Sequence, residues 1–364
     1  MKLRWIVLPL LVLFGCDDPD TAVIAERSTE SIRVANYNTH LARGEAGKLV
    51  TELRDGSAQV DAVIRVIAKV NPDILLVNEL DFDEGREALG LFQERLAVAG
   101  VEYGYSFVAP VNTGRPTGLD LTGDGKDYGP ENAQGWGVFE GQFGMAILSR
   151  LPIKSDEVRT FAGLRWSEMP DNLYPIEYYP EPALEVLRLS SKSHWHVPVQ
   201  VGDKALHLLA SHPTPPVFDG DEDRNGRRNH DEIRFWTDYI DGKDWMLSDQ
   251  GTEGGLAEDD LFIVLGDLNS DPVKGDGRRE AITALLQHER VQDSTPEGSA
   301  GLATADFDEV GRLRVDYVLP STGLELLASG VFWPAKDQAM YGAAISASDH
   351  RLVWIDIGTK NLKN

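Results

Sequence analysis

The sequence is poor in several features that usually identify a class of protein. It contains a single cysteine, Cys16, so no disulfide can form within the chain. Basic residues are also few, because 35 Lys and Arg stand against 59 Asp and Glu and leave a net charge of −24. Nonspecific nucleic-acid binders usually carry a basic face, which this charge disfavours. A dinucleotide fingerprint, a P-loop and a repeat of 20–50 residues are all missing from the sequence, which argues against a Rossmann or solenoid architecture.

The first residues are typical of an export signal. Lys2 and Arg4 precede an apolar run of ten residues, 5–14. This run is too short for a transmembrane helix and fits the apolar part of a signal peptide. Cys16 lies in Leu-Phe-Gly-Cys, which resembles a bacterial lipobox and predicts that residues 1–16 carry a signal with Cys16 as the lipidated residue. A plain signal peptide with an incidental cysteine is the alternative. We expect an exported, membrane-anchored lipoprotein in the periplasm or at the cell surface.

The rest of the chain predicts one folded domain over residues 32–357, preceded by a polar, flexible tether at 17–31. Several predicted strands follow one another without an intervening helix. This pattern favours mixed sheets with outer helices, an α/β (α+β) class, over a doubly wound fold. Apolar periodicity places strands at 32–36, 73–77, 145–148, 205–210, 261–265, 315–319 and 352–357, and helices at 47–70, 88–99, 231–240 and 278–287.

Polar side chains with complementary chemistry recur at the ends of these strands. The clearest case is 261–272, where an apolar run turns at a glycine and presents Asp267 and Asn269. Open α/β folds place their chemistry at the carboxyl edge of their strands. Each such residue alone also fits a solvated loop or a turn. The others at strand ends are Asn38, Glu79, His212, Asp316, Asp349 and His350.

Together these residues form a set that suits hydrolysis of a phosphate ester. Hard divalent cations prefer oxygen ligands, which Glu79 and Asp349 supply. Phosphoryl transfer also needs a positioned water and neutralisation of the developing charge. Asp267 supplies a base, and the amides and imidazoles supply hydrogen bonds to phosphate oxygens.

The order of these motifs resembles the endonuclease/exonuclease/phosphatase superfamily, which has the deoxyribonuclease-I-like fold. The resemblance rests on Asn38, Glu79, Gly-Asp-Leu-Asn at 266–269, Asp-Tyr at 316–317 and Ser-Asp-His at 348–350. It implies a four-layer sandwich with two packed mixed β-sheets flanked by helices. It also implies that residues 32–357 form a metal-dependent phosphoesterase domain.

The same resemblance implies a role for each matching residue. Glu79 would bind a divalent metal, Mg²⁺ or Mn²⁺, with Asp349 completing that site and Asn38 supporting the metal or the phosphate. Asn269 would donate a hydrogen bond to a phosphate oxygen.

The same resemblance assigns proton transfer and charge stabilisation to four other residues. Asp267 would orient or deprotonate the attacking water. Asp316 would pair with His350 and keep it protonated, so that His350 stabilises the charge of the transition state. His212 matches a histidine that some members direct toward the leaving group. A carboxylate beside an imidazole raises its pKa independently of any family.

A short basic segment in the middle of the chain offers further candidates. Lys192, His194 and His196 precede a predicted strand and could contact a phosphate or line the cleft. We predict His194 as a phosphate-binding residue. For His196, a place on a solvated strand edge is the alternative.

Two acidic segments have the spacing of calcium-binding loops. Asp221, Asp223, Asn225 and Glu232 match the EF-hand pattern, and so do Asp120, Thr122, Asp124 and Glu131 with threonine at one ligand position. Alternate oxygens can then face one ion while a glycine permits the sharp turn. The prediction is structural Ca²⁺ in isolated loops, and the alternative is an acidic loop without metal.

The predicted function is therefore an exported metal-dependent phosphoesterase, and small phosphomonoesters, phosphodiesters or nucleotides are favoured as substrates. The strong negative charge disfavours long duplex DNA. Extracellular nuclease and phospholipase C-like activities are the alternatives, with nucleic acid as a possible substrate. A rival of another class is a non-catalytic, calcium-stabilised surface lipoprotein that binds a partner. We expect contact with the membrane through the lipid anchor only, and no oligomer.

Overall fold

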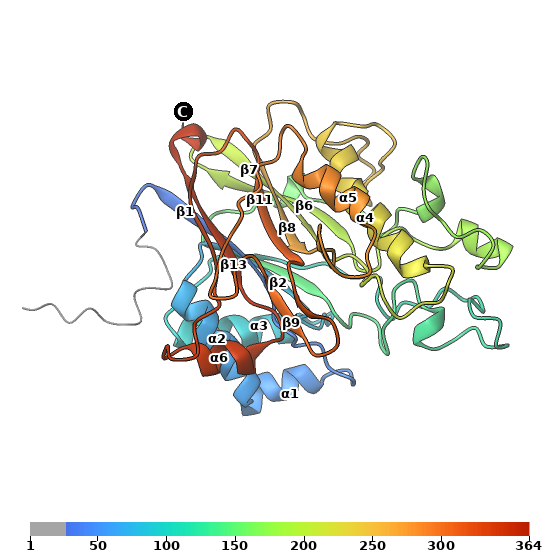
Figure 1. Ribbon diagram of the computed structural model, residues 1–364, viewed down its shortest axis with the longest axis horizontal. Helices are drawn as coiled ribbons and strands as arrows, with labels where there is room; N and C mark the ends of the chain where they lie inside the picture. Colours follow the sequence, from blue (N-terminus) through green and yellow to red (C-terminus); the bar gives the residue numbers. More distant parts are fainter. Residues whose placement is uncertain (1–26, 364) are drawn as a thin grey trace, which may run out of the picture.

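The computed structural model describes residues 27–363, and Figure 1 shows the arrangement of its helices and strands. The predicted signal peptide at residues 1–16, with Cys16, and most of the predicted tether lie outside the described residues. The end of that tether contacts the domain, because Arg27 pairs with Asp73. The first strand begins at Ser31, one residue before its predicted start.

One sheet has six strands in the order β12-β13-β1-β2-β4-β3. The first strand runs antiparallel to the last and parallel to β2. The first and last strands of the described residues therefore lie side by side in the middle of this sheet. Its strands are β1 (Ser31–Asn38), β2 (Ile74–Asn78), β3 (Tyr105–Phe107), β4 (Met145–Ser149), β12 (Leu326–Val331) and β13 (Val353–Gly358).

A second sheet has five strands in the order β11-β8-β7-β6-β5. It is also mixed, since β7 pairs parallel to β8 and antiparallel to β6. Its strands are β5 (Arg159–Thr160), β6 (His194–Val201), β7 (Lys204–Ser211), β8 (Phe262–Asp267) and β11 (Asp316–Pro320). A separate two-stranded ribbon joins β9 (Ala305–Phe307) and β10 (Gly311–Leu313).

Helices cover the outer face of each sheet (Figure 1). The six-stranded sheet carries α1 (Lys48–Asp55), α2 (Ala58–Val70), α3 (Glu87–Val98) and α6 (Tyr341–Ala347). The five-stranded sheet carries α4 (Arg224–Ile240) and α5 (Arg279–Leu286). Among residues 27–363, none of the helices combines the length and the apolar character needed to cross a membrane.

Three apolar clusters separate these layers. One lies between the helices and the six-stranded sheet, one between the helices and the five-stranded sheet, and the third between the two sheets. Val34, Ile74 and Leu76 meet Val197, Leu208 and Ile263 in this central cluster. The predicted four-layer sandwich of two packed mixed sheets flanked by helices is confirmed.

Two helix boundaries differ from prediction for local reasons. The predicted helix at 47–70 is two helices, because Gly56 adopts φ 99° and Ser57 is extended between them. Glycine takes this backbone conformation without the clash that a side chain would cause. The predicted helix at 231–240 begins seven residues earlier, at Arg224, with Asp223 at φ 53° before it.

Several short elements escaped prediction. The strands β3, β5, β9 and β10 have only two or three residues each, too few for an alternating pattern to stand out. The strand β6 is longer and contains His194 and His196, although the sequence analysis places both residues before a strand. The helix α6 was also missed, and its seven residues begin Tyr-Gly-Ala-Ala without a strong apolar stripe.

Candidate active site

The alternation of side chains along β1 places two asparagines between the sheets. Ala35 and Tyr37 belong to the apolar cluster under the helices, whereas Val34 belongs to the cluster between the sheets. Successive side chains of a strand point to opposite faces. Asn36 and Asn38 therefore lie on the same face as Val34, at the carboxyl end of β1, where they meet residues of the other sheet.

The pairing of β8 with β11 brings two aspartates side by side. Asp267 and Asp316 are direct partners in this antiparallel pair, and their side chains are only 1% and 0% exposed. Gly266 lies against β7, and a Cβ atom there would come within 1.9 Å of the Ser211 carbonyl oxygen. The glycine of the Gly-Asp-x-Asn motif thus permits the close approach of two backbones at the site.

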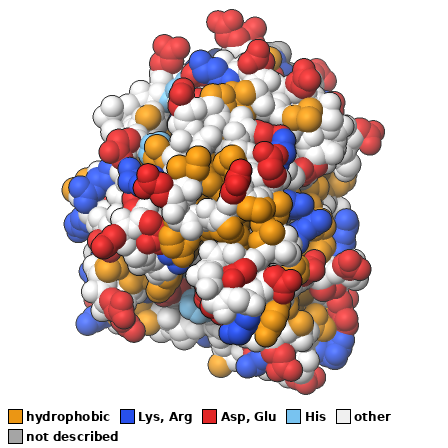
Figure 2. Space-filling model, turned by 90° about the vertical axis from the view of Figure 1, so that its right-hand side faces the viewer, with side chains coloured by type: hydrophobic (Ala, Val, Ile, Leu, Met, Phe, Trp, Pro, Cys, Tyr) orange, Lys and Arg blue, Asp and Glu red, His pale blue; other side chains and the backbone are white. Residues whose placement is uncertain are grey.

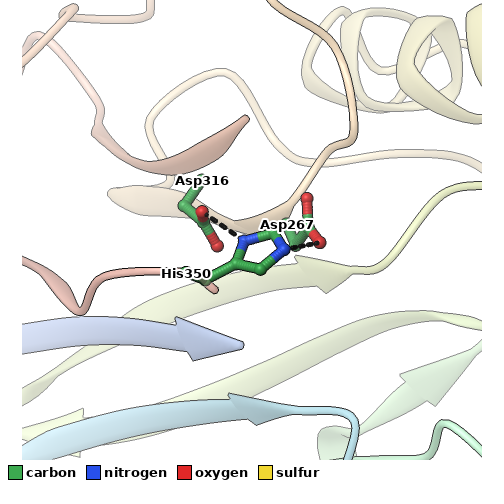
Figure 3. Close-up of side chains that lie close together, drawn as sticks. All are labelled: Asp267, Asp316 and His350. Carbon is green, nitrogen blue, oxygen red and sulfur yellow. Dashed lines mark hydrogen bonds and ion pairs between the residues drawn. The ribbon is translucent and has the colours of Figure 1, made fainter. Parts of the chain in front are cut away.

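His350 lies between these two carboxylates, as Figure 3 shows. Its Nδ1 is 2.8 Å from Asp316 Oδ2 and its Nε2 is 3.8 Å from Asp267 Oδ2. Burial acts to lower the pKa of His350, but the charges of Asp316 and Asp267 and the hydrogen bond to Asp316 raise it to about 10. The ring is therefore an imidazolium at neutral pH.

A line of buried amides supports Asp316 from the six-stranded sheet. Asn78 donates through Nδ2 to Asn36 Oδ1 at 2.6 Å, and Asn36 donates to Asp316 Oδ1 at 3.3 Å. Asn36 and Asn78 belong to strand-end clusters of the sequence, but sequence analysis assigned neither of them a role at the site. Their line to Asp316 depends on contacts between strands that are distant in the sequence.

Asp267 is the carboxylate at the centre of the site. It accepts hydrogen bonds from Asn38 Nδ2 at 2.9 Å and from the Asn269 backbone N–H at 3.0 Å. Burial raises the pKa of Asp267 to about 6, opposed by the positive charge of His350. A carboxylate with this pKa is mostly ionised at neutral pH and is basic enough to accept a proton.

Asn38 links Asp267 to Glu79. The same amide nitrogen donates to Glu79 Oε1 at 3.1 Å, while Asn38 Oδ1 accepts from the His40 backbone N–H. Asn38 thereby orients the Glu79 carboxylate. Ligation of a metal by Asn38 stays a prediction.

Glu79 and Asp349 offer the oxygen atoms that a divalent cation would need. Glu79 follows β2 with φ 60°, a left-handed backbone conformation that costs free energy in a residue with a side chain. The side chain of Asp349 is 36% exposed, and its Oδ1 is 2.9 Å from His40 Nδ1. Burial acts to raise the pKa of Asp349, but the hydrogen bond from His40 and the charge of His350 lower it to about 2. Asp349 therefore stays ionised, as a metal ligand must.

Asp267, Asp316 and His350 form a second group whose ligand atoms lie close enough to hold a metal ion. Their hydrogen bonding favours a different use. Both His350 nitrogens face carboxylates, and a protonated imidazole has no lone pair for a metal. Glu79 and Asp349 fit a hard cation better, because both present carboxylate oxygens and neither is tied to a buried imidazolium.

His212 and Asn269 complete the cluster around Asp267. His212 Nε2 is 3.5 Å from Asp267 Oδ2, and its buried Nδ1 has no hydrogen-bond partner among residues 27–363. Burial, with the charges of Lys192 and His350, lowers the pKa of His212 well below its usual range, so the ring is neutral. Asn269, at φ 52°, donates through Nδ2 to the Pro213 carbonyl oxygen.

The helix α4 fixes the loops that carry these residues. Asn229 donates to the carbonyl oxygens of Thr214 and Leu268, at 2.8 and 2.9 Å. Glu232 accepts from the backbone N–H groups of Ser191 and Thr214, both at 2.6 Å. A buried polar network of this kind holds three loops in one arrangement.

His194 is not at this site, which corrects its prediction as a phosphate-binding residue. Its Nδ1 is hydrogen-bonded to Ser190 Oγ, and its Nε2 lies 2.8 Å from the Glu232 carbonyl oxygen. The ring packs against Phe235 and Trp236 in the layer beneath α4. Burial lowers the pKa of His194 to about 4. Both ring nitrogens are engaged within the protein, so none is left for a phosphate.

The predicted calcium loop at residues 221–232 is also corrected. Asn225 and Glu232 lie within α4, and Glu232 is turned inward to the loops described above. Asp223 is engaged by Arg278, whose Nε is 2.6 Å from its Oδ2. A helix cannot arrange alternate residues around one ion as an EF-hand loop does.

The other acidic loop keeps a loop conformation. Asp120 accepts hydrogen bonds from the backbone N–H groups of Thr122, Gly123, Asp124 and Gly125. Glu131 accepts one from Trp136 Nε1. Calcium binding by Asp120, Thr122, Asp124 and Glu131 stays a prediction.

The fold and this cluster define a class of protein. It is an α/β sandwich that carries an acid, a base and carboxylates suited to a metal ion at one edge of its paired sheets. Residues 37–350 match the model of the Endonuclease/Exonuclease/phosphatase family. The chain belongs to this family, whose members are hydrolases that act on phosphate esters and use divalent metals.

Solved structures support the same fold. An endonuclease/exonuclease/phosphatase from Beutenbergia cavernae is 18% identical, with a TM-score of 0.55 over 90% of this chain and 72% of that one. A family protein from Leptotrichia buccalis is 15% identical, with a TM-score of 0.50 over 90% and 99% of the two chains. No curated protein sequence matches the chain.

Proposed function

We propose that this protein is an exported, metal-dependent phosphoesterase that cleaves phosphate esters with an activated water. One observation carries the proposal. A buried, ionisable base, Asp267, lies between a protonated His350 and a neutral His212, with the Glu79 carboxylate one amide away. General acid–base chemistry needs such neighbours with opposite pKa shifts.

Each of these side chains has a distinct part in the proposed reaction. Asp267 accepts the proton of the attacking water. His350 donates a hydrogen bond through Nε2 to a phosphate oxygen whose charge grows in the transition state. His212 is the proposed contact to the oxygen of the leaving group. Asn269 is the proposed donor to a phosphate oxygen, through the Nδ2 hydrogen that the Pro213 carbonyl oxygen does not use.

A divalent cation, Mg²⁺ or Mn²⁺, would be held by Glu79 and Asp349. When bound, it would neutralise negative charge on the phosphate oxygens. Asn38 contributes by fixing the Glu79 carboxylate, and His40 by fixing Asp349. The four carboxylates near the site would otherwise repel a phosphate, so turnover should require the cation.

Small phosphomonoesters, phosphodiesters or nucleotides are the proposed substrates. Figure 2 views the molecule from the side of α4 and shows acidic side chains scattered over this face without a continuous basic area. Extracellular nuclease activity on long DNA would normally need such an area. Apolar side chains gather near the middle of the same face (Figure 2), which favours a phospholipase C-like activity as the second candidate.

The proposal includes attachment of the protein to a membrane through a lipid on Cys16. To test it, cells are fed a labelled fatty acid and then fractionated. We expect the wild-type chain to take up the label and Cys16→Ser to lack it. Release of Cys16→Ser from the membrane fraction is the expected result. A wild-type chain without label that is absent from the membrane fraction would instead favour export by a plain signal peptide.

The activity is tested with a chromogenic phosphomonoester and a chromogenic phosphodiester, each with EDTA, Mg²⁺, Mn²⁺ or Ca²⁺. Nucleotides, an oligonucleotide and phospholipid vesicles are then compared side by side. We expect turnover that depends on Mg²⁺ or Mn²⁺. Absence of turnover by the wild type on every substrate and metal would instead favour the non-catalytic binding lipoprotein.

A further inference from the structure

Lys192 is a buried cation for which the site described above gives no role. It lies in the segment before β6, and only 5% of the residue is exposed. Lysine is rarely buried to this extent unless it is paired. Yet within residues 27–363 its ammonium has neither a hydrogen-bond partner nor a carboxylate at ion-pair distance.

Lys192 nevertheless lies next to the catalytic cluster. His194 pairs with Ser211 across β6 and β7, and the backbone N–H groups of Ser191 and Thr214 both donate to Glu232. The charges that act on the Lys192 ammonium most strongly are the carboxylates of Glu232, Glu79 and Asp267, and it acts in turn on His212. Burial lowers the pKa of Lys192, and these carboxylates oppose that effect. The pairing of these two segments places Lys192 beside the loop that carries His212.

The backbone around Lys192 is rigid. Its carbonyl oxygen accepts from the Asn112 N–H at 2.9 Å, and the preceding Ser191 donates to Glu232 through both N–H and Oγ. Gly135 packs so closely that a Cβ atom would come within 2.2 Å of the Ser191 carbonyl oxygen. A side chain on such a support is held in place rather than displayed on a mobile loop.

A purely structural use of Lys192 would be to balance the buried charge of Glu232. Glu232 already accepts three hydrogen bonds, two at Oε1 and one at Oε2. These donors stabilise the carboxylate without a salt bridge. The ammonium thus stays available for an anion that enters the site.

We propose that Lys192 is a substrate-binding residue whose ammonium contacts a non-bridging oxygen of the phosphate beside His212. The assignment rests on the proposed phosphoesterase function and adds to it the cation that fixes the phosphoryl group on the leaving-group side. An ammonium in a poorly hydrated site binds a phosphate oxygen strongly, because little water screens the charge.

The test measures binding of inorganic phosphate by calorimetry, with Mg²⁺ present, to the wild type, Lys192→Met and Lys192→Arg. Lys192→Met removes the charge at nearly constant volume. It should weaken phosphate binding about tenfold or more, because a hydrogen bond to a charged group usually contributes this much affinity. Lys192→Arg keeps the charge and should retain more of the affinity. Because a buried, unpaired ammonium costs stability, Lys192→Met should have an unchanged or higher Tm.

The structural alternative gives the opposite pattern. If Lys192 balances Glu232, Lys192→Met lowers Tm, the double variant with Glu232→Gln recovers it, and phosphate binds as in the wild type. That result overturns the assignment, and so does a wild type that binds no phosphate. Phosphate binding needs no turnover, so a chain that binds phosphate through Lys192 but hydrolyses no ester would overturn the proposed function alone.

Discussion

The two sheets contribute carboxylates of different exposure to one site. On the six-stranded sheet, the Asp349 side chain is 36% exposed and its pKa is lowered to about 2, whereas burial raises the pKa of Glu79. Those from the five-stranded sheet, Asp267 and Asp316, are at most 1% exposed, and burial raises the pKa of Asp267 to about 6.

This difference separates two chemical tasks. An ionised carboxylate near solvent suits a hard cation, which arrives hydrated and keeps some of its water. A buried carboxylate between two imidazoles suits proton transfer, because its pKa lies near the operating pH. The sandwich thus brings the exposed Asp349 of one sheet close to the buried carboxylates of the other.

The largest expected effect comes from the proton-transfer side. Asp267→Asn and His350→Ala should each lower kcat by about 10²–10⁴-fold, the usual contribution of a positioned acid or base. Steady-state kinetics at saturating Mg²⁺ measure this. The matched control is His288→Ala, which removes an imidazole paired with Asp241 on another part of the chain and should leave kcat unchanged. Near-normal rates for Asp267→Asn would remove it from the role of base.

Substitution of Glu79, on the six-stranded side of the site, should lower the rate by weakening metal binding. Glu79→Gln should weaken Mg²⁺ binding by about tenfold or more, and higher Mg²⁺ should restore part of the rate, which it cannot do for Asp267→Asn. Titration calorimetry with Mg²⁺ checks the affinity directly. Asp316→Asn is the comparison, since a metal held by Asp267, Asp316 and His350 would be lost there instead.

The alkaline limit of the reaction should depend on Asp316. The pKa of His350 is raised to about 10, so the imidazolium is present below this pH and is lost as the pH rises through it. Asp316→Asn removes the largest favourable charge, and the alkaline limb of the kcat profile should move toward the ordinary histidine value. We expect a loss of roughly tenfold near pH 9, relative to pH 7. An alkaline limb that stays in place in this variant would exclude His350 as its source.

A smaller effect on stability distinguishes a histidine of the core from those of the site. The pKa of His194 is lowered to about 4, so the unfolded chain binds more protons than the folded one between that pH and about 6.5. Stability should therefore fall as the pH drops through this window, by roughly 1–3 kcal/mol for this group. Denaturant unfolding at pH 7 and pH 4.5 should show a weaker dependence for His194→Gln, while an equal dependence would assign the loss to other groups.

Much of the site was foreseeable, because its members lie next to short, strongly apolar strands. Asp267, Asp316 and His350 are where the sequence placed them, and the structure brings Asn38, Glu79, His212 and Asn269 to the same cluster. The burial and pairing of these groups had no local sign. Asn36 and Asn78 resemble ordinary strand residues, and their line to Asp316 exists only because two sheets face each other.

The wrong expectations share a cause. The spacing of Asp221, Asp223, Asn225 and Glu232 is the same in a loop and in the start of a helix, and the packing of α4 on the five-stranded sheet selected the helix. Trp195 and Val197 of β6 lie in the cluster between the sheets, so the alternation of the strand turns His194 to the opposite face, toward Phe235. Lys192 precedes β6, and this alternation does not place it.

The longer strands, the polar residues at their ends and the resemblance to the family could be read from the sequence, because apolar periodicity and residue type are local properties. The tertiary structure alone decided which carboxylate is buried, which imidazole is protonated and which asparagine presents its nitrogen. These properties depend on the charges and the solvent around each group, and segments hundreds of residues apart supply them.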